Sequence, residues 1–164
     1  MQTAVAALTA ILTTDVALHE RMLAAADAKR AAIMTGDLPA MEASLNAEYD
    51  LIEKIRAQAP QREALVADLA AKLAVAEQPP TLRALTAKLP PEWRGEIDAA
   101  REKLKTVLEK LRLRLRANTE LLKASMDHAQ AFMEMLRHSG DEAQTYNRHG
   151  KMERAPARLI NRRA

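Results

Sequence analysis

An unbroken heptad repeat runs along residues 97–136 and favours a long helix that packs against other helices. The predicted seam, counted alternately four and three, consists of Ile97, Arg101, Leu104, Leu108, Leu111, Leu115, Asn118, Leu122, Ser125, Ala129, Phe132 and Leu136. Apolar residues that recur every 3.5 residues lie on one narrow stripe of a helix, and that stripe must pack against another helix. No Gly or Pro interrupts the repeat. The sequence therefore predicts one helix about 60 Å long at roughly 1.5 Å per residue.

The composition favours helices over the rest of the chain as well. Ala, Leu, Glu, Lys and Arg are strong helix formers and dominate the sequence, whereas aromatic residues make up only 2%. Sheets favour β-branched and aromatic side chains. We therefore expect an all-α protein, an elongated antiparallel helical hairpin or coiled-coil bundle with a flexible C-terminal tail. The absence of Cys excludes disulfides and thiolate chemistry.

Gly and Pro residues divide the chain into helices. We expect helices over about residues 3–34, 38–59, 61–76 and 92–138, with a Pro-rich connector over residues 77–91. Gly36 ends the first helix, and Asp37 caps the second. Pro60 either kinks a long helix or starts a third one. The helix before the connector is expected to run back against the helix after it. This gives a helical domain over residues 1–138 and a mobile basic tail over residues 139–164.

Residue patterns typical of catalysis are scarce. His128 and His138 lie ten residues apart, so they do not share a helical face as a zinc-binding pair would. No Gly-rich phosphate loop, nucleophile elbow or Glu-x-x-His motif is present. We therefore expect no enzyme activity, no small-molecule substrate, no metal and no cofactor. Neither a signal peptide nor an apolar run long enough for a membrane span is present, which favours a cytoplasmic protein.

Two features of the last helix allow more than one interpretation. Asn118 and Ser125 are polar at seam positions, where they either bond across to the first helical layer or loosen the seam for a partner helix. Near the end of the helix, Met residues gather beside Phe132. Met fills cores, but it is also common on surfaces that bind varied apolar helices. The expected client groove consists of Leu122, Met126, Ala129, Phe132, Met133 and Leu136.

Arg112, Arg114 and Arg116 form a basic stretch with neighbouring lysines. Acidic residues are interspersed and stacking aromatics are missing, so a solvated, salt-bridged face is favoured over a nucleic-acid surface. A basic nucleic-acid-associated protein and a structural coiled-coil scaffold are the two alternatives to a binding protein.

Several short motifs resemble those of the FlgN-type flagellar export chaperones. They are the Gly36-Asp37 turn, Arg62 about 25 residues later, the segment 118–122 (Asn-Thr-Glu-Leu-Leu), the segment 145–150 (Thr-Tyr-Asn-Arg-His-Gly) and the segment 159–164 (Leu-Ile-Asn-Arg-Arg-Ala). Pro60 departs from the family, in which this helix is often continuous.

The resemblance implies an ATP-independent chaperone of the hook–filament junction proteins. Such a chaperone would bind the C-terminal helices of FlgK and FlgL, prevent their premature assembly and deliver them to the cytoplasmic domain of the export gate. In the tail, Tyr146 either packs back on Met133 or Leu136 or docks the loaded chaperone on the gate. We favour docking. The residues expected to take part are Tyr146, Arg148, Arg162 and Arg163.

Overall fold

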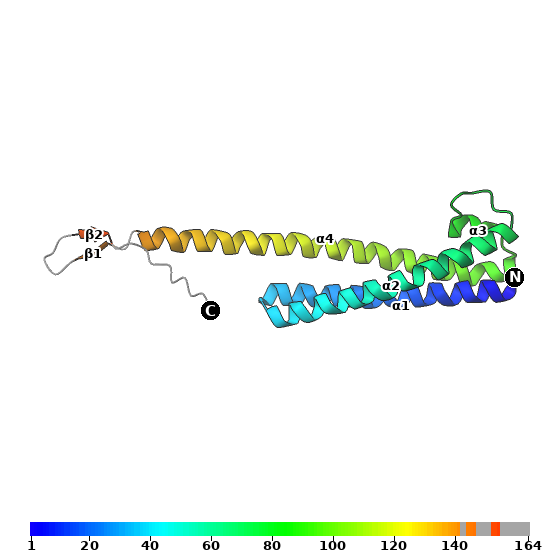
Figure 1. Cartoon of the computed structure of the whole chain (residues 1–164), viewed down its shortest axis with the longest axis horizontal. Helices are drawn as coiled ribbons and strands as arrows, with labels where there is room; N and C mark the ends of the chain where they lie inside the picture. Colours follow the sequence, from blue (N-terminus) through cyan, green and yellow to red (C-terminus); the bar gives the residue numbers. More distant parts are fainter. Residues whose placement is uncertain (142–143, 147–151, 155–164) are drawn as a thin grey trace. The chain divides into compact units, whose positions relative to one another are not determined.

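A computed structural model of the chain describes residues 1–141, 144–146 and 152–154, with side chains through residue 138. Its elements are α1 (Gln2–Thr35), α2 (Leu38–Lys72), α3 (Leu82–Lys88), α4 (Pro91–Asp141), β1 (Gln144–Tyr146) and β2 (Met152–Arg154) (Figure 1). The predicted all-α class is confirmed. The two short strands were not expected. They pair in antiparallel fashion, with Tyr146 opposite Met152.

The chain divides into two compact units, residues 1–119 and residues 120–164, and the division lies within α4. From the sequence, a boundary is expected after residue 138, where the helical periodicity ends. The division lies earlier because Asn118 is the last buried residue of α4 among those whose side chains are described.

A tight turn joins α1 to α2, as predicted. Gly36 has a left-handed backbone (φ 68°, ψ 22°), which only a residue without Cβ adopts at little cost. The next residue, Asp37, caps α2 by accepting a hydrogen bond of 3.0 Å from the backbone N–H of Ala40. Pro39 stands in the first turn of α2, where a backbone N–H is not needed. The turn makes α1 and α2 an antiparallel hairpin.

The helix α2 continues through Pro60 to Lys72. Of the two alternatives for Pro60, the structure has the single long helix, so residues 38–59 and 61–72 form one element rather than two. Pro60 lies on the exposed side of α2, so the backbone carbonyl that loses its bond to the proline nitrogen can be reached by solvent. A helix can accommodate a proline when the carbonyl that loses its hydrogen bond lies on the solvent-exposed face.

The Pro-rich connector contains the short helix α3. Thr81 caps it by accepting a hydrogen bond of 3.2 Å from the N–H of Ala84. Leu85 and Leu89 of this segment are almost completely buried against α1, α2 and α4. The connector therefore closes one end of the bundle core as well as linking α2 to α4.

Two apolar clusters form the core of the first unit. The larger cluster contains Val5, Leu8, Leu12, Val66, Leu69, Ala70, Leu85, Leu89, Ile97 and Ala100. The smaller cluster contains Leu18, Met22, Ala26, Leu51 and Leu111. From the first cluster to the second, the residue numbers rise along α1 and α4 and fall along α2. The unit is thus a bundle in which α1 and α4 run parallel and α2 runs antiparallel to both.

The buried stripe of α4 differs in phase from the predicted seam. Ile97, Leu111 and Asn118 are buried as expected, but Ala100 and Val107 are buried where the seam had Arg101 and Leu108. Leu108 and Leu115 are exposed. The buried stripe and the predicted seam share every second position. At the remaining positions, the buried residue comes one residue before the predicted one. The core lies on one side of the predicted stripe, so the other side remains open to a ligand.

Candidate functional site

The part of α4 in the second unit carries a run of exposed apolar side chains. Leu122 is 40% exposed, Phe132 58%, Met133 63% and Leu136 52%. Met126 and Ala129 are exposed as well. These six residues are the predicted client-binding residues, and we call them the α4 stripe. Single exposed apolar residues are ordinary, but a contiguous set marks an interaction surface.

The helical geometry places these side chains on one face. Leu122, Met126, Ala129, Met133 and Leu136 are separated by four, three, four and three residues, which is the spacing of one side of a helix. Phe132 borders this face. Met135 is equally exposed, but it lies well around the helix from Met133. The α4 stripe therefore has the shape of half a helix–helix interface.

The charged residues in this part of α4 are mostly acidic, and most of the acidic ones lie on the side of the helix away from the α4 stripe. Residues 120–141 contain Glu120, Asp127, Glu134 and Asp141 against only two Lys or Arg residues. This balance opposes that of the bundle portion of α4, which is basic.

The two polar seam residues have different environments. Asn118 is buried, and its side-chain amide donates a hydrogen bond of 2.7 Å to the backbone carbonyl of Ala26 on α1. This bond is the one expected if Asn118 bonds across to the first helical layer. Ser125 is exposed and donates to the carbonyl of Leu121 in its own helix at 3.0 Å. A role in partner selection stays a prediction for both residues.

Of the residues expected to dock on the export gate, only Tyr146 lies in a described element. It is the last residue of β1, opposite Met152. The backbone there is paired with β2, in a segment that the sequence analysis treats as irregular. Arg148, Arg162 and Arg163 lie outside the described residues.

Buried ion pairs cross the α1–α2 hairpin, and the sequence reasoning missed them. The carboxylate of Asp15 is fully buried and accepts a hydrogen bond from the guanidinium of Arg62. Further along the hairpin, the ammonium of Lys29 bonds to Glu48 at 2.5 Å. Asp15 lies within an apolar stretch of α1, which was the available signal. Arg62 stood out only through the family resemblance.

The basic stretch of α4 is partly salt-bridged. Arg114 pairs with Asp27 of α1 at 2.8 Å, and Arg101 pairs with Asp98 and Glu102. These pairs agree with the salt-bridged interpretation of this face. Arg112 has no ion pair among the described side chains.

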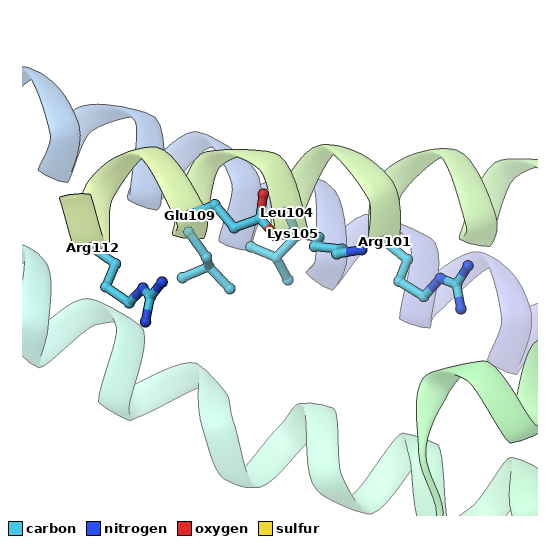
Figure 2. Close-up of a pocket in the computed structure, with 6 residues that line it drawn as sticks. Arg101, Leu104, Lys105, Glu109 and Arg112 are labelled. Carbon is cyan, nitrogen blue, oxygen red and sulfur yellow. The ribbon is translucent and has the colours of Figure 1, made fainter. Parts of the chain in front are cut away.

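Arg112 also helps to line a groove on α4 that is open to solvent and has a volume of about 340 Å³. The other lining residues are Arg101, Leu104, Lys105, Leu108 and Glu109. Figure 2 shows Arg101 and Arg112 extending from α4 into the space that faces α2. Sequence reasoning did not single out this groove, because it counted Leu104 and Leu108 as part of a fully packed seam.

Two searches of the described residues bear on other kinds of site. No three His, Cys, Asp or Glu side chains among them are grouped so as to hold a metal ion. No described helix is long and apolar enough to cross a membrane.

The comparison with protein families decides the class of the protein. A family model described as FlgN protein matches residues 1–154. The chain belongs to the FlgN family. This FlgN-type protein is a flagellar export chaperone, in agreement with the resemblance found in its short motifs. The family is one of chaperones rather than enzymes. Searches of curated proteins and of solved structures gave no significant match.

Proposed function

We propose that this FlgN-family chain is a cytoplasmic type III export chaperone that binds the C-terminal helices of the junction proteins FlgK and FlgL. Binding would cover the apolar face of each client helix, prevent premature assembly and present the client to the export gate. The alternatives, a nucleic-acid-associated protein and a structural scaffold, are not carried further because the matched family is one of chaperones.

The observation that carries this proposal is the exposed α4 stripe. A client whose terminal helices pair only in the assembled filament leaves an apolar face uncovered before assembly. An amphipathic helix can bind such a client by laying its own apolar residues against that face. The α4 stripe supplies exposed residues over 15 positions of one helix, from Leu122 to Leu136. No bond needs to be made or broken, so binding alone performs the task.

Isothermal titration of the full chain with synthetic C-terminal peptides of FlgK and FlgL tests the proposal. We expect saturable binding to each peptide. As a control, peptides with the same charges but with Ser in place of the apolar-face residues should not bind. Absence of binding to both unmodified peptides would contradict the client assignment, whereas the family membership would stand.

A further inference from the structure

A second apolar surface lies on the bundle, on the side of α4 that faces α2 (Figure 2). Its floor on α4 is formed by Leu104 and Leu108 within the 340 Å³ groove. Leu108 is 41% exposed, and Leu115 is exposed two turns further along. A groove of this kind takes the side chains of an extended ligand rather than an enclosed small molecule.

The helix α2 contributes a second row of exposed apolar residues. Leu45, Tyr49 and Ile52 are exposed and are spaced as one face of a helix. Ile52 directly follows the core residue Leu51, just as Leu108 follows the buried Val107. Because α2 and α4 run antiparallel, this one-residue step turns both rows toward the same side of the helix pair. The two rows therefore face the same side of the bundle, and the residues that line the groove itself all belong to α4.

The rim of this groove on α4 is basic. Lys105 and Arg112 line it and have no ion pair among the described side chains. Arg101 lines the groove as well, and Glu109 is the one acidic residue in its lining. The groove therefore suits a ligand that carries acidic residues.

We propose that the groove on α4, on the side that faces α2, binds an acidic amphipathic helix of a partner protein. On the other side of the same helix pair, α1 fills the corresponding position in the core. A helix bound in the groove would complete a four-helix arrangement, with its apolar face on Leu108, Leu115 and Ile52. Its carboxylates would lie beside Lys105 and Arg112. This site differs from the α4 stripe and does not depend on the client assignment.

Binding of designed peptides to the full chain tests the proposal. The probe is a fluorescent amphipathic peptide of about 18 residues, roughly five helical turns, with Leu on one face and Glu beside it. The control peptide has Lys in place of every Glu. By fluorescence anisotropy, we expect the acidic peptide to bind about tenfold more tightly or better, because its charges complement the rim. Equal binding of the two peptides, or no binding of the acidic one, would overturn the proposal.

Matched variants on α4 locate the binding site. Leu108→Ser and Arg112→Glu should each weaken binding of the acidic peptide by about fivefold or more. Leu113→Ser and Lys103→Glu make the same changes at exposed positions of α4 that do not line this groove, so they should have no effect. All four positions are exposed, and circular dichroism should show an unchanged fold.

A variant of the α4 stripe separates this proposal from the proposed function. Met133→Asp should leave binding of the acidic peptide unchanged. If Met133→Asp abolishes that binding while the Leu108 and Arg112 variants keep it, the peptide occupies the α4 stripe and the groove assignment is wrong.

Discussion

The side-chain amide of Asn118 on α4 donates a hydrogen bond of 2.7 Å to the backbone carbonyl of Ala26 on α1, and both residues are buried. Asn118→Ala should lower the free energy of unfolding by about 1–2 kcal/mol, because it removes this bond and its packing. Ser125→Ala, at the exposed seam position, should change it by less than about 0.5 kcal/mol. Urea denaturation followed by circular dichroism measures both. Equal losses would show that the two polar seam positions are equivalent.

The buried carboxylate of Asp15 depends on Arg62 for compensation. Arg62→Ala should destabilise the fold by about 3 kcal/mol, because it leaves a buried charge without its partner. The double variant with Asp15→Ala should lose less than the sum of the two single losses. The control is Arg56→Ala, which breaks an exposed pair with Glu53 on the same helix and should cost less than about 0.5 kcal/mol. Chemical denaturation of Arg62→Ala, Asp15→Ala and the double variant gives the coupling energy between Asp15 and Arg62. Additive losses of stability would contradict this coupling.

The α4 stripe predicts a sharp difference between two methionines. Burying a large apolar side chain contributes about 1.5–3 kcal/mol of binding free energy. Met133→Asp should therefore weaken binding of a FlgK or FlgL C-terminal peptide roughly tenfold or more. Met135→Asp is the matched control, since Met135 is as exposed as Met133 but lies off the stripe. Titration calorimetry measures both affinities, and circular dichroism checks the helix content. If both variants bind alike, the predicted face is wrong.

Tyr146 predicts a separation of two binding activities. Tyr146→Ala should leave the affinity for the client peptide within about threefold of the original value. It should weaken binding to the cytoplasmic domain of the export gate by about thirtyfold, or roughly 2 kcal/mol. An aromatic side chain supplies much contact area at little cost in rotamer entropy. Thr145→Ala, one residue earlier in β1, is the control. Unchanged gate binding, or an equal loss toward the client, would remove the docking role.

Two glycines predict stability changes of opposite sign. Gly36→Ala should cost about 1 kcal/mol, because Gly36 has a left-handed backbone that a Cβ disfavours. Gly95→Ala, in the exposed interior of α4, should add about 0.5–1 kcal/mol, because Ala restricts the unfolded chain and no atom lies near its Cβ. Thermal and urea unfolding of the two variants test this pair. If Gly36→Ala raised the stability instead, the turn would not require a left-handed residue at position 36.

Much of the fold follows from local sequence signals. Gly36 and Asp37 mark the turn between α1 and α2, because their roles depend on nearby backbone atoms. Pro60 was harder to interpret, because its cost depends on whether the affected carbonyl faces water, which only the packed bundle determines. The phase of the α4 core was missed for a related reason. Leu108 and Val107 are both apolar, and only the positions of α1 and α2 decide which one is buried.

The candidate surfaces were predictable to different degrees. The α4 stripe follows from spacing and side-chain type alone. Its residues are exposed, and their role in client binding stays a prediction. The groove beside Arg112 required the antiparallel pairing of α2 with α4, which sets the direction in which Ile52 and Leu108 project. The pair of Asp15 and Arg62 joins residues on two helices, and no local pattern relates them.

The parallel alignment of α1 with α4 affects the order in which the bundle can assemble. Asn118 and Ala26 are 92 positions apart in the chain, whereas α1 and α2 meet through a turn of a few residues. Contacts between neighbouring segments form early, and distant ones must first overcome the entropy of closing a long loop. The hairpin of α1 and α2 can therefore form before α4 docks on it. Until α4 docks, Leu8, Leu12 and Leu69 lack part of their cover, which leaves apolar surface of the hairpin exposed to other chains.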